Sequence, residues 1–320
     1  MFALRGLMIS LSIFTLLYIL LSLAVLCVWR RLLGFLRFSA ATAANLLFTL
    51  RVIPFVLAAA ATLLLAVPSF VLLEPRGMRE PIGTVPLVLG LGGILLLFVG
   101  IGKAVAALAR TDRIISRWSQ QAGATDLHAV CSDDRVALQR ISGAVPPLTA
   151  AGILRPSVWL SRAAESVLTE RELHCALRHE LVHVRRHDNL RKLILRFVAF
   201  PGMEELESVW SESSEMASDD AAVASASEAL DLATAVIKLS RLLPLAPPPA
   251  ELTTGLVDSP ADSLQARIER LLAWSEQPTP AQEYRWRYLL FAAFAMAGTL
   301  AVTYSQLLGR VHAATEWLVR

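Results

Sequence analysis

Four stretches of the sequence, each longer than 20 residues, contain no Asp, Glu, Lys or Arg. They are residues 6–29, 52–73, 81–102 and 288–309. A helix needs about 20 apolar residues to cross the hydrocarbon core of a bilayer, and it satisfies its own backbone hydrogen bonds in lipid. The pattern therefore predicts four transmembrane helices, three of them within residues 1–102.

The arginines around these windows predict how the chain crosses the membrane. The loop between the first two windows holds no acidic residue and several basic ones, namely Arg30, Arg31, Arg37 and Arg51. Since Lys and Arg favour the cytoplasmic side, we expect the N-terminus outside, residues 103–287 in the cytoplasm and a short tail, residues 310–320, outside. A cleaved signal peptide is the alternative for the first window, but its apolar stretch is too long and no A-x-A site precedes Arg30. We expect a multi-pass cell-membrane protein whose spans contact lipid.

Composition fits a membrane protein and gives no sign of nucleic-acid binding. Hydrophobic residues make up 55% of the chain and charged residues only 18%, whereas soluble proteins are about a quarter charged. The net charge of +3 is explained by the basic loops, so we expect no direct nucleic-acid partner. The cysteines, Cys27, Cys131 and Cys175, form no C-x-x-C pair, and a reducing cytoplasm argues against a disulfide.

Residues 103–287 contain no further long uncharged stretch and predict a soluble domain. Between Asp126 and Leu160, short apolar runs alternate with turn formers such as Pro146-Pro147 and Gly152. This alternation predicts a small set of strands. Helical patterns follow the strands, so the predicted fold class is α+β, with four transmembrane helices and the soluble domain between the third and fourth.

Local signals place the helices of this domain. Thr169 and Glu172 form a capping box, so we expect a helix that begins near Glu170 and continues to about Ala199. A second helical stretch is expected over 203–243, broken at most once, and an amphipathic helix over 264–274, after a proline-rich turn. The first helix carries a basic run, for which we favour a solvated face over contact with anionic lipid. The run is Arg178, Arg185, Arg186, Arg191, Lys192 and Arg196.

The first predicted helix contains the sequence His179-Glu180-Leu181-Val182-His183. Residues four apart share one face of a helix, so both imidazoles can bind a single ion. Catalytic zinc sites use such nitrogen ligands and leave one position for water. Glu180, next to the first ligand, would take the proton of that water and pass it to the leaving amine. The motif therefore predicts a Zn²⁺ site with Glu180 as general base.

A third ligand must come from elsewhere in the chain. His187 lies four residues beyond His183, but the glycine turn that would direct a third histidine to the metal is missing between them. Glu215, on the next predicted helix, is the better candidate. Asp219 is four residues further on the same helix face and would accept the second N–H of a ligand histidine. The alternative for both acids is a solvated acidic face.

The sequence around these positions resembles peptidase family M56, the membrane metallopeptidases of the BlaR/MecR type. The resemblance covers most of the chain. Its first part is the motif with the residues that follow it, namely His179-Glu180-Leu181-Val182-His183, Arg186, Asp188 and Leu190. Its second part is Glu215, Ala217 and Asp219, which match the family's E-x-A-C-D pattern at these three positions. It implies a gluzincin-type zinc metalloprotease domain in which His179, His183 and Glu215 bind zinc.

The chain departs from the family pattern at several positions. Ser218 stands where the family usually has Cys, and Ala222 where Val is common; neither should affect zinc. Phe200-Pro201-Gly202-Met203 replaces an aromatic-rich stretch, which changes the expected local packing. Only residues 310–320 follow the last apolar window, so we expect no penicillin-binding sensor domain and no β-lactam sensing through one.

Together these features predict a membrane-embedded zinc endopeptidase in regulated proteolysis or signalling. By the resemblance, its partner would be a cytoplasmic protein or peptide substrate such as a transcriptional repressor. The segment Leu148–Leu160 is a candidate edge strand that could pair with an extended substrate. One alternative is a membrane-protein quality-control protease resembling peptidase family M48. Another is a non-catalytic signal-transducing scaffold, against which the intact Glu180 argues. Substrate and oligomeric state stay open.

Overall fold

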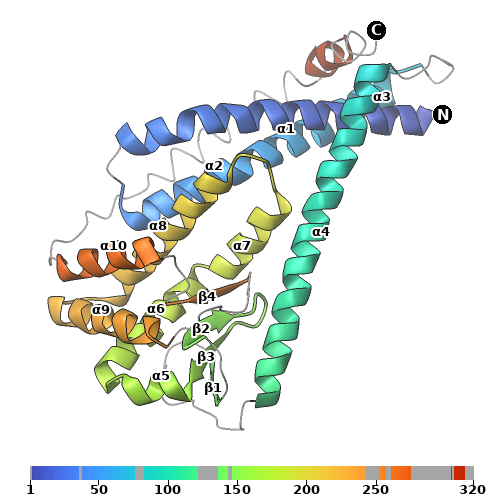
Figure 1. Ribbon diagram of the computed structural model, residues 1–320. Helices are drawn as coiled ribbons and strands as arrows, with labels where there is room; N and C mark the ends of the chain where they lie inside the picture. The colour runs from blue at the N-terminus through green and yellow to red at the C-terminus, as the bar shows by residue number, and fades with distance from the viewer. Residues whose placement is uncertain are drawn as a thin grey trace. The chain divides into compact units, whose positions relative to one another are not determined.

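The computed structural model of the chain is mostly helical, with one small sheet (Figure 1). It describes residues 2–35, 38–75, 83–121, 136–142, 146–242, 252–256, 261–274, 304 and 306–313. The chain divides into two compact units. One comprises residues 1–30, 50–99 and 278–320, and the other residues 31–49 and 100–277. We call them the apolar unit and the soluble unit.

Three helical segments are long and apolar enough to cross a membrane. The first is α1 (Phe2–Phe35), and the third is α4 (Thr84–Gln121). The second runs without interruption through α2 (Ala40–Ala61), the π-helical turn η1 (Thr62–Ala66) and α3 (Val67–Leu73). These helices contain the first two apolar windows and residues 84–102 of the third, which suggests a membrane protein. Most of the fourth window, 288–309, lies outside the described residues.

The helices extend beyond the windows that predicted them. Arg30 and Arg31 belong to the last turns of α1, and Arg51 lies inside α2. The prediction that Arg30, Arg31 and Arg51 lie in a loop between the first two spans is therefore wrong. Hydropathy measures only the part of a helix that can lie in hydrocarbon, and arginine is a good helix former outside it. The side of the membrane on which these arginines lie stays a prediction.

Close helix packing holds the apolar unit together. A Cβ atom on Gly90 of α4 would lie only 2.9 Å from the carbonyl oxygen of Met8, so glycine lets α4 approach the backbone of α1. Phe14 and Tyr18 of α1 pack edge-to-face against Phe55 of α2. Small residues and aromatic contacts are typical of helix association in a membrane.

A four-stranded sheet forms the centre of the soluble unit. It contains β1 (Ala137–Ile141), β2 (Leu148–Ala151), β3 (Ser157–Ser161) and β4 (Thr253–Gly255), in the order β1-β3-β2-β4. β1 runs parallel to β3, whereas β2 is antiparallel to both β3 and β4. The prediction that the segment Leu148–Leu160 provides an edge strand is wrong, because β2 and β3 are both internal. The three-residue β4, distant in sequence, covers the side of β2 that would otherwise be free.

Both faces of the sheet are buried at its inner strands, because successive side chains point to opposite faces and nearly every residue of β2 and β3 is buried. One face packs against α5 and α6 and contributes Leu148, Ala150, Val158 and Leu160 to the main core, to which α9 adds residues from the other side of α6. The opposite face packs against the end of α4, where Trp118 and Trp159 lie with ring centroids 5.7 Å apart. The sheet is thus a rigid layer on which α6 rests.

The first two helices after β3 begin at well-formed caps. Ser161 caps α5 (Arg162–Val167), and the predicted capping box of Thr169 and Glu172 opens α6 (Glu170–Arg185). The predicted continuation of that helix to Ala199 is wrong, because it ends at Arg185 and α7 (Asp188–Phe197) follows. The break falls at His187, which adopts a left-handed conformation with φ of 56°, and no α-helix can continue through it.

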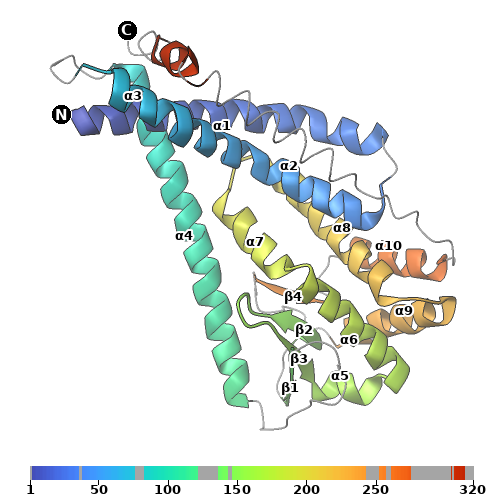
Figure 2. The same cartoon turned by 180° about the vertical axis from the view of Figure 1, so that it is seen from behind.

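Three further helices complete the soluble unit. The predicted stretch 203–243 is broken once, into α8 (Glu204–Ala222) and α9 (Ala226–Ser240). The predicted amphipathic helix is α10 (Ala261–Leu272). Figure 2 shows α7 and α8 on the far side of the sheet from β1, with α9 and α10 beside α8. The position of α8 against α6 matters most, since it brings distant parts of the sequence together.

Candidate metal centre

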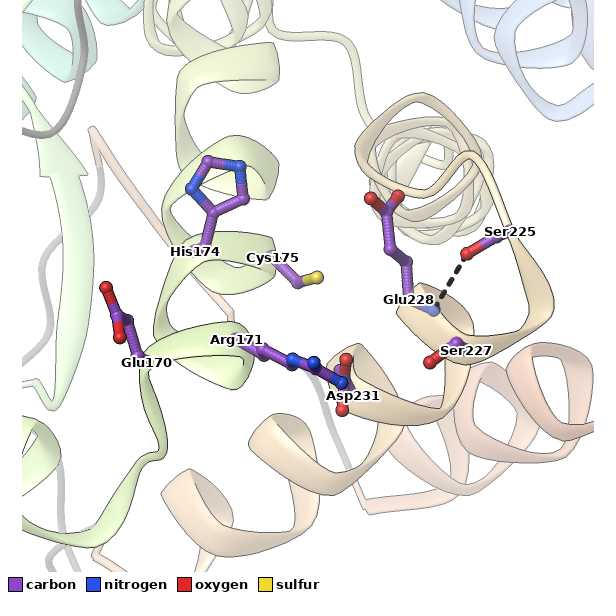
Figure 3. Close-up of a pocket in the computed structure, with 8 residues that line it drawn as sticks. All are labelled: Glu170, Arg171, His174, Cys175, Ser225, Ser227, Glu228 and Asp231. Atoms are coloured by element: carbon purple, nitrogen blue, oxygen red, sulfur yellow. Dashed lines mark hydrogen bonds between the residues drawn. The ribbon is translucent and has the colours of Figure 1, made fainter.

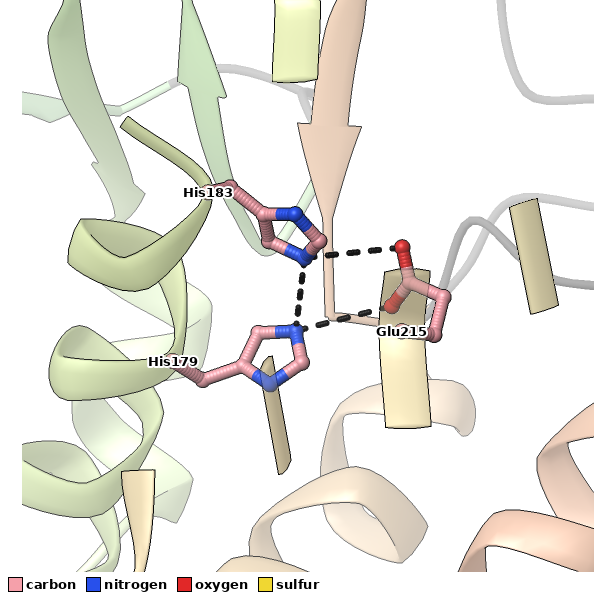
Figure 4. Close-up of side chains that lie close together, drawn as sticks. All are labelled: His179, His183 and Glu215. Carbon is pink, nitrogen blue, oxygen red and sulfur yellow. Dashed lines mark hydrogen bonds and ion pairs between the residues drawn. The ribbon is translucent and has the colours of Figure 1, made fainter. Parts of the chain in front are cut away.

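Two histidines of α6 and one glutamate of α8 form a buried group (Figure 4). The Nε2 atoms of His179 and His183 lie 3.1 Å apart. Each is 3.5 Å from a different carboxylate oxygen of Glu215. The exposed fractions are 0%, 2% and 6% for His179, His183 and Glu215. The structure thus brings the three predicted ligands together, and the group could hold a metal ion.

A carboxylate lies beside the outer ring nitrogen of each histidine. Nδ1 of His183 hydrogen-bonds to Oδ2 of Asp188 over 2.7 Å, and Nδ1 of His179 lies 2.9 Å from Oδ1 of Asp219. Ser214 donates a further hydrogen bond to Asp188. Such carboxylates orient imidazole ligands and keep the proton on Nδ1. Asp219 therefore lies where the sequence predicted it, and Asp188 takes the same position for the other histidine.

The turn between α6 and α7 is what places Asp188. In a continuous helix, a residue five positions after His183 would be rotated by about 140° away from it. The left-handed His187 instead ends α6 and starts α7 at Asp188, whose side chain turns back to the ring of His183. The motif spacing alone does not predict this contact, because it depends on a backbone conformation that non-glycine residues rarely adopt.

The two facing Nε2 atoms argue for a positive charge between them. If both imidazoles are neutral, the Nδ1 protons point to the carboxylates of Asp188 and Asp219 and both Nε2 atoms carry lone pairs. Two lone pairs 3.1 Å apart repel unless a proton or a metal ion lies between them. Ligand atoms that share one tetrahedral metal ion are about 3.3 Å apart at nitrogen and oxygen bond lengths of 2.0–2.1 Å, which is close to the separations in this group.

Charges around the group favour a cation in the same way. Burial disfavours a charged imidazole, but the charge of Glu215 and the hydrogen bond to Asp188 outweigh it and raise the pKa of His183 to about 10. Burial likewise opposes ionised carboxylates, yet His183 and Arg267 hold the pKa of Glu215 well below its ordinary value. Arg267 lowers the pKa of Asp219 to about 2. The site therefore keeps its carboxylates ionised and attracts positive charge.

Glu180 lies on the same turn of α6 and is fully buried. Its Oε2 accepts a hydrogen bond from the backbone N–H of Ala150 in β2 over 3.0 Å. Thr149 of β2 in turn donates to the carbonyl of Thr254 in β4. The predicted base is therefore held against the sheet, and the conformation described leaves it no direct opening to solvent.

Arg267 of α10 is a site residue that the sequence analysis missed. Its side chain is buried, and its Nε and Nη2 atoms donate to the two oxygens of Asp219 over 2.8 and 2.7 Å. The sequence does contain a signal that Arg267 is buried. Arg267 is three residues after Leu264 and four before Leu271, so it falls in the apolar stripe of an amphipathic helix. A charge in such a stripe indicates a buried partner.

Other polar residues singled out by the sequence do not belong to this group. His187 is exposed, and its Nδ1 lies 2.9 Å from the carbonyl oxygen of Val184. Several members of the basic run contact other parts of the soluble unit. Arg178 pairs with Glu228, and Lys192 donates to the carbonyl of Thr253. These contacts leave a smaller solvated basic face than the sequence predicted.

A separate cavity of about 510 Å³ lies between the beginnings of α6 and α9 (Figure 3). Its lining includes His174, Cys175 and Asp231, but none of the three clustered ligands. Burial, with the charges of Glu228 and Asp231, raises the pKa of the Cys175 thiol to about 11. A thiol with such a pKa is a poor nucleophile at neutral pH, so we assign no chemistry to this cavity.

Comparisons with known proteins add nothing to this description. A scan against protein-family models finds no match to the chain, and a search of curated proteins also finds none. The resemblance to peptidase family M56 therefore stays a prediction from the residues quoted above.

Proposed function

We propose that the protein is a membrane-embedded zinc endopeptidase of the gluzincin type. The observation that carries this proposal is the buried group of His179, His183 and Glu215, with the carboxylate of Glu180 on the same helix turn. Two imidazoles and one carboxylate are a common ligand set of catalytic zinc, in which a fourth position is free for water or substrate. The resemblance to family M56 is in agreement with it.

In this proposal each residue has a defined task. His179, His183 and Glu215 hold the ion, which when bound supplies the Lewis acidity that polarises a peptide carbonyl and activates a water. Glu180 takes the proton of the attacking water and returns it to the nitrogen of the leaving amine. Asp188 and Asp219 keep the Nδ1 protons of the histidines in place, so that both Nε2 atoms stay available as ligands.

The proposed substrate is a cytoplasmic or membrane-proximal protein, and a transcriptional repressor fits the resemblance. The cytoplasmic position of the soluble unit, residues 103–287 in the sequence prediction, belongs to the proposal as well. An extended substrate cannot pair with β2 in the conformation described, because β3 and β4 occupy both of its sides. Because Glu180 is buried, we expect a local opening of the soluble unit before cleavage.

The test is the substitution Glu180→Gln in the purified, detergent-solubilised full chain. Gln keeps the shape of Glu but cannot take a proton, so cleavage of an unstructured fluorescent casein should fall by about 10²–10⁴-fold. Bound zinc, measured by metal analysis, should stay at one ion per chain. Glu170→Gln is the matched control, because Glu170 is an exposed residue at the start of the same helix and its loss should leave cleavage unchanged.

The outcomes separate the alternatives. Cleavage that persists in the Glu180→Gln chain would refute the mechanism, and zinc binding without cleavage in the wild type would favour a non-catalytic scaffold. Proteins that accumulate uncleaved in cells with Glu180→Gln identify the substrates. A narrow set would favour regulated proteolysis, and a broad set of misassembled membrane proteins would favour quality control.

A further inference from the structure

Arg267 connects the two carboxylates on one face of α8. Its Nε and Nη2 atoms hold both oxygens of Asp219, while Nη1 donates to the carbonyl of Leu256 and lies 3.0 Å from Oε2 of Glu215. All polar atoms of the guanidinium therefore face the site or the chain segment next to it. Arg267 itself is 1% exposed, so these contacts are shielded from bulk solvent.

These contacts restrict the one ligand that would otherwise be free to turn. The terminal torsion of a glutamate side chain is broad, and nothing in the α8 backbone fixes it. With Nη1 of Arg267 against Oε2, the carboxylate plane of Glu215 is held so that each oxygen faces one histidine. Arg267 is in turn fixed by two hydrogen bonds to Asp219, a fork geometry that lysine cannot reproduce.

We propose that Arg267 is the positioning residue of the metal centre, which orients Glu215 and Asp219 together and so sets the affinity for zinc. The inference rests on the proposed function. An opposing effect is the repulsion between the guanidinium and a metal cation. Asp219 neutralises the guanidinium through a two-bond ion pair, so orientation of the ligand outweighs repulsion. Replacing residues that orient ligands in this way usually weakens metal binding by about 10–100-fold.

A purely structural explanation is that Arg267 only attaches α10 to α8. The chain offers a matched control for it. One turn further along α10, Arg270 pairs with Asp220 over 2.6 Å and donates to the carbonyl of Met216. This pair connects the same two helices but contacts none of the clustered ligands.

The experiment measures zinc affinity of the full chain in detergent by competition with a chromophoric chelator, at pH 7. Arg267→Gln should raise the Kd for zinc by about 100-fold, and Arg267→Lys by about tenfold because one ammonium reaches only one carboxylate well. Arg270→Gln should leave the Kd within a factor of two. The absorption spectrum of the Co²⁺-loaded chain reports ligand geometry, and it should change in both Arg267 variants only.

Each possible result either supports or contradicts the role proposed for Arg267. If the wild type binds no zinc, the proposed function fails and this inference with it. If the wild type binds zinc but both Arg267 variants bind it as tightly, or Arg270→Gln weakens it equally, only the inference fails. An unfolded Arg267→Gln leaves the decision to Arg267→Lys. If neither variant folds without metal, Arg267 is a structural residue and the inference is overturned.

Discussion

Removing the metal ion should lower the melting temperature of the soluble unit by about 8–16 °C. The prediction follows from where the ligands come from in the chain. His183 and Glu215 are on different helices, so only the folded state offers all three ligands at once. An ion that binds the folded but not the unfolded chain stabilises it by about 4.1 kcal/mol when its free concentration is 1,000 times the Kd.

The shift in temperature follows from the size of the unit. Residues 31–49 and 100–277 form one compact unit, and for a unit of roughly 200 residues each kcal/mol changes the melting temperature by about 2–4 °C. The main core on the α6 face of the sheet does not include the ligands. We therefore expect the metal-free chain to stay folded at room temperature and to melt in a single, earlier transition.

The assay is thermal unfolding of the detergent-solubilised chain at one scan rate, with zinc buffered in excess or removed by a chelator. Trp159 and Trp210 are buried in the soluble unit, so their fluorescence reports its unfolding. His183→Asn removes a ligand and should abolish the difference between the two conditions. His187→Asn, four residues further, should keep it, because asparagine tolerates the left-handed conformation.

The reasoning is refuted if the wild-type melting temperatures at saturating zinc and after chelation differ by less than about 1–2 °C. A difference that small is about the effect of one weak contact. It is refuted equally if His183→Asn keeps the full shift, since the ion would then bind elsewhere. Loss of the shift in His187→Asn as well would assign the effect to the turn between α6 and α7.

Two further predictions concern α6 and its end. Glu172→Gln removes the charge that accepts from Nζ of Lys238 over 2.8 Å, and it should lower the free energy of unfolding by about 1.5 kcal/mol at pH 7. Burial opposes the charged form, yet Lys238 and the N–H of Thr169 lower the pKa of Glu172 below 4.5. The stabilisation is therefore present above pH 4.5 and lost as the pH falls through the folded-state pKa, so urea titrations of variant and wild type should converge in acid. His187 already has a Cβ atom at φ of 56°, so His187→Ala keeps the backbone strain and should change the free energy of unfolding little, whereas His187→Gly relieves it and should be more stable than the alanine variant by about 1–2 kcal/mol; equal effects of Gly and Ala would exclude backbone strain.

Local sequence signals predicted the parts of the site that lie on one helix. The capping box of Thr169 and Glu172 is formed by residues three apart, and the motif places His179 and His183 on one face. Both follow from the geometry of a single helix. Glu215 was predicted from its spacing to Asp219 and from the family resemblance, and the packing of α8 on α6 brings it to the histidines.

The missed features depend on contacts between distant parts of the chain. Asp188 reaches His183 only because His187 is left-handed, and no turn residue such as glycine marks that position. β4 has three residues and exists only through its pairing with β2, so no periodicity could indicate it. Arg267 becomes a site residue only when α10 packs on α8, although its place in an apolar stripe was readable in the sequence.

The charges buried at this one place are hard to explain by stability alone. Asp188, Glu215 and Asp219 are ionised and nearly inaccessible. Arg267 pairs with Glu215 and Asp219, while Arg186 and Arg191 lie near Asp188. Apolar residues of similar volume would usually stabilise such a core as well or better, because desolvating ions costs several kcal/mol each. The Nε2 atoms of the two histidines face each other at 3.1 Å, an arrangement that requires a proton or a metal ion between them and that helix packing alone does not need. A divalent cation at their common centre would interact favourably with the carboxylates and both imidazoles at once, and the group could hold such an ion.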